Sequence, residues 1–182
     1  MLIKETERLT IRQFELGDCD FIIRLLNEPS FIENIADKGV RNREQATTYL
    51  NDGPLKAYRE QGHGLYLVSL RNSGQPIGMC GLIKRDCFQE VDLGYAYLPQ
   101  FTGQGYAQES GRAVLEYGAQ VLGLKTVIAI VQPANKPSTT LLERLGFTQV
   151  DTVILPPPCS TDLLARYRLI LPVLPMPDPA PR

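Results

Sequence analysis

The sequence predicts an α/β domain built on one mixed, largely antiparallel, twisted sheet of about seven strands, flanked by about four helices. Segments of two-residue hydrophobic period alternate with segments of helical period along the chain. Three strand-like segments between residues 64 and 98 follow one another through turn residues, which is typical of an antiparallel meander. The run TVIAIV at 126–131 is apolar throughout, as in a strand buried on both faces.

The N-terminal half of the chain is expected to begin with a strand in ERLTIRQF, where Leu9 and Ile11 alternate with polar residues. Asp18 is suited to cap a first helix, which Pro29 ends. A more polar helical region follows at residues 43–58 and is interrupted near residues 53–54. The three strands of the meander are expected at 64–70, 77–86 and 90–98.

The C-terminal half is expected to start with the strongest helix of the chain. Its core-facing positions recur at helical spacing: Gly111, Val114, Leu115, Gly118 and Leu122. The strand at 126–131, a helix from the cap Asn135 to Gly146, and strands at 148–155 and 163–171 complete the order. Residues 1–174 are therefore expected to form one domain, and the proline-rich tail 175–182 is expected to be disordered or extended.

The composition is typical of a soluble globular protein, with 182 residues, 43% hydrophobic and 21% charged content and a net charge of -1. This charge argues against a nucleic-acid backbone as the main partner. The N-terminus has no apolar signal-peptide core, and no apolar run approaches the roughly 20 residues of a membrane span. We therefore expect a cytoplasmic protein with no membrane and no nucleic-acid partner.

The cysteines and the single histidine give no reason to expect a metal site. Cys19, Cys80, Cys87 and Cys159 include no C-x-x-C pair, so reduced and mostly buried thiols are expected. His63 stands between two glycines without partners for a dyad or a metal. The sequence has no G-x-S-x-G elbow, which argues against a Ser-His-Asp hydrolase.

The stretch QFTGQGYA at Gln100–Ala107 joins a predicted strand to a predicted helix and is suited to hold a phosphate. Glycines let the backbone approach an oxygen, and the helix start adds unpaired N–H groups and the positive end of its dipole. A dinucleotide fingerprint would need Gly or Ala where the chain has Gln108, and a P-loop would need Gly-Lys-Ser/Thr. The expected ligand is a pyrophosphate, bound by neither of these two motifs.

Four motifs in order carry a resemblance to a known family. Gln100-x-x-Gly103-x-Gly105 resembles the Q/R-x-x-G-x-G/A signature with which GNAT N-acetyltransferases hold the pyrophosphate of acetyl-CoA. Segments 6–14, 92–99 and 135–147 resemble further motifs of the family in order and spacing. The resemblance is to the branch of Rim-type ribosomal-protein N-terminal acetyltransferases.

This resemblance implies acetyl-CoA as co-substrate, with no metal. The backbone amides of Thr102–Ala107 would face the pyrophosphate, and a backbone N–H of the segment Tyr97-Leu98 would meet the thioester oxygen. Asn135 would cap its helix and bond the pantetheine arm. The residues implied in acetyl-CoA binding are Tyr97, Leu98, Gln100, Thr102, Gly103, Gln104, Gly105, Tyr106, Ala107, Asn135 and Ser138.

Direct attack of an amine on the thioester needs a base and gains from a proton donor to the leaving thiolate. Glu90 and Asp92 lie two apart on a predicted strand and therefore face one side, and they are the candidate bases. Many relatives place a tyrosine acid where this chain has Leu142, which leaves Ser138 as the candidate acid. Ser138 could equally satisfy a local backbone group of its helix.

The acceptor stays open between a protein N-terminal α-amine, which the branch resemblance implies, and a small-molecule amine. Residues 27–64 would form most of its pocket, and an acidic rim at Glu28, Glu33 and Asp37 would suit a cationic acceptor. Leu142 motivates an alternative function as a non-catalytic acyl-CoA-binding or sensor module. A phosphate-binding domain of other ancestry is a third interpretation, and relatives imply a monomer or a homodimer.

Overall fold

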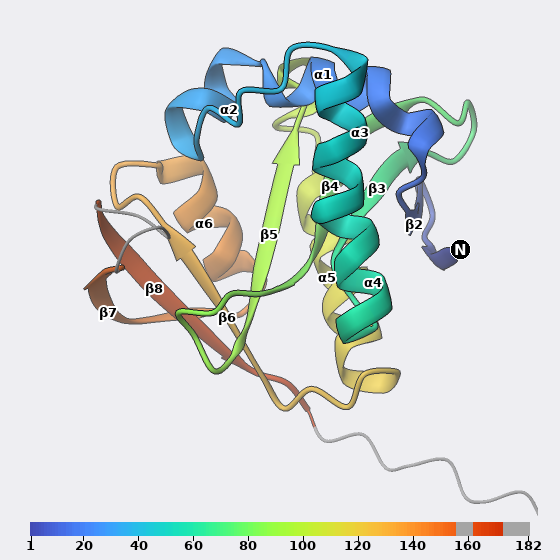
Figure 1. Cartoon of the computed structure of the whole chain (residues 1–182). Coiled ribbons are helices and arrows are strands. Elements are labelled where there is room, and N and C mark those ends of the chain that lie inside the picture. Colours follow the sequence, from blue (N-terminus) through green and yellow to red (C-terminus); the bar gives the residue numbers. More distant parts are fainter. Residues whose placement is uncertain (156–161, 173–182) are drawn as a thin grey trace, which may run out of the picture.

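The computed structural model describes residues 1–155 and 162–172, so the expectation for the tail 175–182 lies outside the described residues. The described chain forms one sheet with helices on both sides (Figure 1). The strands and α-helices follow in this order: β1 Leu2–Glu5, β2 Leu9–Gln13, α1 Cys19–Leu26, α2 Pro29–Asn34, α3 Arg43–Asp52, α4 Pro54–Gln61, β3 Leu65–Leu70, β4 Pro76–Lys84, β5 Val91–Tyr97, α5 Tyr106–Gln120, β6 Thr126–Val131, α6 Lys136–Arg144, β7 Thr148–Ile154 and β8 Leu163–Ile170.

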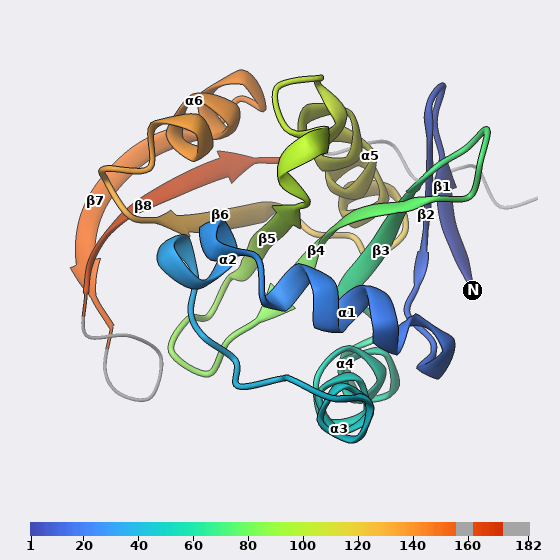
Figure 2. The ribbon, with the colours of Figure 1, turned by 90° about the horizontal axis from the view of Figure 1, so that it is seen from above.

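The eight strands lie in one sheet in the order β1-β2-β3-β4-β5-β6-β8-β7. All neighbours in it are antiparallel except β5 and β6, which are parallel. Figure 2 shows α5 and α6 on one face of the sheet and α1, α3 and α4 on the other. These findings confirm the predicted α/β class with a single mixed, largely antiparallel sheet.

The sequence does not predict two elements near the N-terminus. β1 pairs with β2 and lies ahead of the expected first strand. α2 begins at Pro29, which occupies the first turn of this helix, where its missing N–H costs nothing. Asp18 precedes α1 as expected, but its carboxylate accepts hydrogen bonds from Arg12 and from the N–H of Glu15 instead of from α1.

The two faces of the sheet pack into separate apolar cores, because successive side chains of a strand point to opposite faces. A third, smaller cluster contains Phe88, Ile128, Leu155 and Leu164. On β5, Leu93 packs in the core that includes Val114 of α5, whereas Leu98 just beyond the strand packs in the core that includes Leu25 of α1. A residue of β5 therefore faces one helical layer or the other according to its position. No helix in the described ranges is both long and apolar enough to cross a bilayer.

Candidate active site

The loop between β5 and α5, residues 99–105 and called here the phosphate loop, has the backbone that an anion cradle requires. Gly103 and Gly105 adopt φ of 72° and 83°, the left-handed region that side chains disfavour. Gly105 is the N-cap of α5, and the loop from Thr102 to Gly105 is exposed. A solvent-facing start of a long helix is suited to bind an anion.

The N–H groups of Gly103–Gly105 and of the start of α5 lack acceptors within the described chain. The first backbone hydrogen bond of α5 runs from Glu109 N to Gly105 O at 3.0 Å. No described residue accepts from the N–H of Gly103, Gln104 or Gly105. Together with the unpaired amides of Tyr106 and Ala107, these donors point to a site for a pyrophosphate.

Thr102 is a correction to the predicted cradle. Its N–H donates to Pro99 O at 3.1 Å, and its hydroxyl donates to the same oxygen at 2.8 Å. A donor so committed is not free for a ligand. Gln100 contributes in a similar way through its backbone, because its carbonyl accepts from Gln104 Nε2 at 2.7 Å. Thr102 and Gln100 therefore shape the phosphate loop from within.

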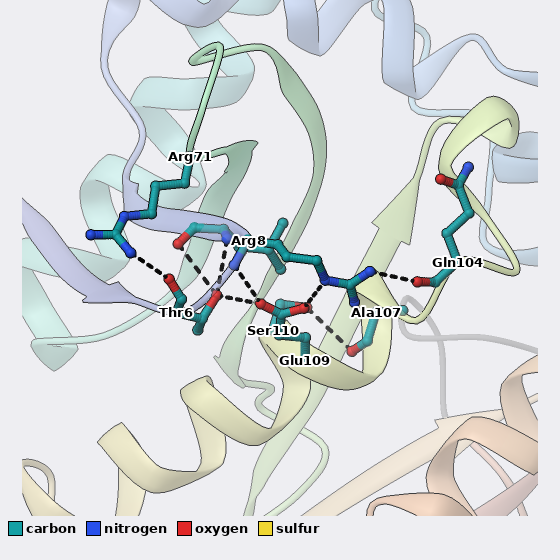
Figure 3. A network of polar contacts seen from close by, with 8 residues as sticks. Thr6, Arg8, Arg71, Gln104, Ala107, Glu109 and Ser110 are labelled. Atoms are coloured by element: carbon teal, nitrogen blue, oxygen red, sulfur yellow. Dashed lines mark hydrogen bonds and ion pairs between the residues drawn. The ribbon is translucent and has the colours of Figure 1, made fainter.

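Arg8 and Glu109 connect the phosphate loop to the start of β2, as Figure 3 shows. Arg8 Nε donates to Glu109 Oε2 at 2.7 Å, and Arg8 Nη1 donates to Gln104 O at 3.0 Å. Thr6 Oγ1 donates to Glu109 Oε1 at 2.6 Å. The guanidinium also lies 4.5 Å from the ring centre of Tyr106. Sequence reasoning missed this network because its partners lie 101 positions apart.

β5 and β6 diverge beside the phosphate loop and leave a gap in the middle of the sheet (Figure 1). Their parallel pairing is limited to Val91 with Val127 and Asp92 with Ile128. Residues Gly94–Tyr97 are only partly buried, although β5 is a central strand. Beyond these two pairs, β5 therefore has no described strand partner on its β6 side.

Only one of the two residues expected to offer a backbone donor to the thioester can do so. Leu98 is fully buried, and its N–H donates to Ile77 O at 2.9 Å, so the expectation for Leu98 as donor is wrong. Hydrogen-bonded and non-hydrogen-bonded pairs alternate along an antiparallel ladder, and Tyr97 faces Gly78 in the next pair. The N–H of Tyr97 therefore points away from β4 and into the gap.

Asp92 lies on β5 where the gap begins, and only 1% of its surface is exposed. Arg85 Nε donates to Asp92 Oδ2 at 2.6 Å, whereas Oδ1 has no hydrogen-bond partner among the described residues. Burial raises the pKa of Asp92 from 3.8 to about 6, while Arg85 and, to a smaller extent, the backbone of Ile130 limit the rise. A carboxylate with this pKa is ionised at neutral pH and can still accept a proton.

Glu90 does not share a strand with Asp92, which corrects the predicted carboxylate pair. It lies in the bend before β5. Its carboxylate accepts a hydrogen bond from Arg168 Nη2 of β8 at 3.1 Å. The two carboxylates thus have different arginine partners, and Asp92 alone lies on the edge of the gap.

Asn135 is the N-cap of α6, and Ser138 lies in the first turn of that helix. Asn135 Oδ1 accepts from Ser138 N at 3.3 Å, so the predicted cap is confirmed. The Ser138 side chain is a hydrogen-bond partner of the Tyr95 hydroxyl on β5, whereas Thr139 Oγ1 donates to Lys136 O within α6. The Ser138 hydroxyl is therefore not used to satisfy its own helix.

Several buried polar groups are protonated or already hydrogen-bonded. Cys80 is fully buried, and burial raises the pKa of its thiol to about 12, so it stays protonated. The hydroxyls of Tyr97 and Ser110 are hydrogen-bonded to each other. His63 Nδ1 lies 2.8 Å from Leu82 O. Within the described ranges no three His, Cys, Asp or Glu side chains could hold a metal together.

The region expected to form the acceptor pocket contains a cavity of about 470 Å³. Its lining belongs to the segment before α3 and to α3 itself: Lys38, Gly39, Val40, Asn42, Glu44, Gln45, Thr48 and Tyr49. Asp37 of the expected acidic rim is paired with Arg41, with Arg41 Nη2 2.7 Å from Asp37 Oδ2. The rim is therefore less negative than the sequence predicts.

A free-amide cradle at a helix start, beside diverging central strands, is the arrangement that the resemblance to acetyltransferases implies. Residues 8–148 match the acetyltransferase (GNAT) domain family, and the chain belongs to that family. The uncharacterised N-acetyltransferase p20 of Bacillus licheniformis is 30% identical over 148 residues, which cover 78% of this chain and 80% of that protein.

Solved structures agree with this assignment. The acetyltransferase from Agrobacterium tumefaciens is 27% identical, covers 91% of this chain and 92% of its own, and superposes with a TM-score of 0.74. RimL, a ribosomal-protein α-N-acetyltransferase solved in complex with coenzyme A, is 15% identical. It superposes with a TM-score of 0.82 over 95% of this chain and 99% of its own, which is a likeness of fold.

Proposed function

We propose that this acetyltransferase moves the acetyl group of acetyl-CoA to an amine by direct attack of that amine on the thioester. The gap between β5 and β6, opening beside the phosphate loop, carries the proposal. A pyrophosphate on the free amides of 103–107 would let an extended pantetheine arm follow the gap, where the N–H of Tyr97 is free for the thioester oxygen. The buried thiol of Cys80 argues against an acyl-enzyme on that residue.

Asp92 is the proposed base. An amine becomes strongly acidic once it has formed its bond to the carbonyl carbon, so even a carboxylate of pKa about 6 can take its proton. Because Oδ1 is buried, the proposal has a water carry the proton from the amine to this carboxylate. Glu90 is a weaker candidate because Arg168 holds it away from the strand.

The proposed acceptor is a protein N-terminal α-amine or a small-molecule amine. The fold likeness to RimL supports the first, since that protein is named for a ribosomal-protein substrate. The cavity lined by Lys38, Glu44 and Tyr49 has room for part of either kind of acceptor. Its mixed charge does not favour a polycation.

The test begins with calorimetric titration of the full chain with acetyl-CoA, and with ATP and NAD in parallel. We expect one-to-one binding of acetyl-CoA in the micromolar range and none of the other two. Thiol release is then measured over a panel of N-terminal peptides and small amines, each matched with its N-acetylated form as control. Binding without amine-dependent release across the panel would favour the sensor module, and preference for ATP or NAD would contradict the proposal.

A further inference from the structure

We propose that the hydroxyl of Tyr95 donates a hydrogen bond to the thiolate that leaves when the acetyl group is transferred. The inference rests on the function proposed above and assigns a residue to the step for which Leu142 supplies no donor. Leu142 is 1% exposed and packs in the core beneath α5 and α6.

Tyr95 and Asp92 stand on opposite faces of β5, at the start of the gap. Positions 93, 95 and 97 share one face, and positions 92, 94 and 96 share the other. Tyr95 packs against the core that includes residues of α5 and α6, whereas Ala96 packs against the core of α1 and α3. The base candidate and the hydroxyl therefore flank the gap from two sides. Such an arrangement suits an amine that arrives on one side and a thiolate that leaves on the other.

The Tyr95 hydroxyl reaches the N-terminal part of α6, where Ser138 is its polar neighbour. Its oxygen lies 3.4 Å from Ser138 O, which is long for an O–H···O hydrogen bond, whose usual length is about 2.7–2.8 Å. The hydroxyl can exchange this long bond to Ser138 for a shorter one to a ligand. Ser138 lies one helical turn before Leu142, so a hydroxyl from the sheet reaches the helix segment on which Leu142 has none.

Tyr95 is suited to be a hydrogen-bond donor and not a full acid. Burial raises the pKa of its hydroxyl to about 12, and a hydrogen bond with the Ser138 side chain opposes that rise. Cys80 on β4, Asp92 on β5 and Tyr167 on β8 each raise it a little further. The hydroxyl is therefore protonated at neutral pH, whereas a thiol ordinarily titrates near ~8.5. As the C–N bond forms and the C–S bond breaks, the electron pair moves to sulfur, where the Tyr95 O–H stabilises it. The amine's proton leaves through Asp92 or water, and water later protonates the thiolate.

The test uses Tyr95→Phe in the full chain and measures the pKa of the coenzyme A thiol while it is bound to the protein. Free coenzyme A is bound, and the pKa of its thiol is followed by the ultraviolet absorbance of the thiolate. We expect the pKa of the bound thiol to rise by about 1 in the variant, because a hydrogen bond to the charged form is lost. Affinity for desulfo-coenzyme A, which has no sulfur, should be unchanged. For acetyl transfer, kcat should fall by about 10-fold with little change in the KM for acetyl-CoA.

Tyr117→Phe is the matched control, because Tyr117 is a partly buried tyrosine of α5 that packs edge-on against Tyr66. It should change neither the thiol pKa nor kcat. An equal thiol pKa in wild type and Tyr95→Phe would overturn this inference and leave the proposed function standing. A shift in Ser138→Ala but not in Tyr95→Phe would also overturn it, in favour of the serine. A wild-type protein that binds no coenzyme A would contradict the proposed function, and this inference with it.

Discussion

Arg85 holds Asp92 by a single donor, with Arg85 Nε 2.6 Å from Asp92 Oδ2. The side chain of Asp92 is 2% exposed and that of Arg85 34%, so a buried carboxylate is joined to a cation that still contacts water. The two effects oppose each other, since burial raises the pKa of Asp92 and the positive charge lowers it. The effect of burial is the larger one, so the pKa of Asp92 rises to about 6 and this carboxyl changes charge close to neutral pH.

Asp92→Asn is expected to change the pH profile of kcat/KM. Two events raise the wild-type rate with pH, because Asp92 must be ionised and the amine must be neutral. A logarithmic plot should therefore rise with a slope of about 2 below pH ~6 and about 1 above it. The variant should keep a slope of about 1 throughout and bind acetyl-CoA normally. Parallel profiles for both proteins would remove Asp92 from the mechanism.

Arg85→Gln should move the lower limb of the same profile to higher pH. The guanidinium favours the ionised carboxylate, so its removal raises the pKa of Asp92 above about 6 and delays the formation of the base. Arg166→Gln is the control, because it removes an arginine from a similar pair with Asp151 outside the gap. A lower limb that stays in place in Arg85→Gln would show that this ion pair does not set the titration.

Gly105→Val is expected to abolish binding of acetyl-CoA while the fold is retained. The residue has φ of 83°, and an added Cβ would meet Arg8 Nη2 at 3.3 Å, so the variant must distort the start of α5. Gly123→Val is the matched control, since Gly123 has φ of 65° with nothing within 4 Å of an added Cβ. Both variants should lose similar stability in thermal unfolding. Unchanged affinity in Gly105→Val would refute the role of the phosphate loop.

The Arg8–Glu109 pair should support acetyl-CoA binding indirectly, by holding the phosphate loop in place. Arg8→Met and Glu109→Gln are each expected to weaken the affinity by about 5–10-fold, because the phosphate loop loses its attachment to β2. The double variant should lose little more than either single one, as expected for two partners of one interaction. Calorimetry measures all three affinities.

Lys4→Met provides the comparison for that pair. Lys4 and Glu116 also join β1 to α5, but their charged atoms lie 3.7 Å apart and both side chains are largely exposed. Exposed pairs of this kind contribute little. A loss of affinity in Lys4→Met as large as in Arg8→Met would mean that general charge, and not the attachment of the loop, explains the effect.

Local patterns explain why most of the fold could be predicted. Two-residue alternation places Leu9 and Ile11 in the core, and the capping role of Asn135 follows from its position before α6. β1 was not predicted because it has only four residues, partly exposed, and so carries too little hydrophobic pattern. α2 was not predicted because a proline can both end one helix and begin the next, and Pro29 was assigned only the first role.

The site was only partly predictable, because its donors are set by pairing between distant strands. The glycines of the phosphate loop are visible in the sequence, but the loss of the Leu98 donor depends on its register with Ile77. The division of Glu90 from Asp92 depends on where β5 starts, a boundary that composition does not fix. Arg85 lay seven positions before Asp92, and only the turn between β4 and β5 brings the two together.

The gap between β5 and β6 has a consequence for hydrogen exchange. Amides in the centre of a large sheet are usually the last to exchange with deuterium. Here the N–H of Tyr97 faces the gap, whereas that of its neighbour Leu98 is held by Ile77, so adjacent amides of one central chain segment should exchange at very different rates. A ligand that fills the gap would slow the exchange of the Tyr97 amide. Deuterium uptake at this one amide in the middle of the sheet would then show whether the ligand is bound.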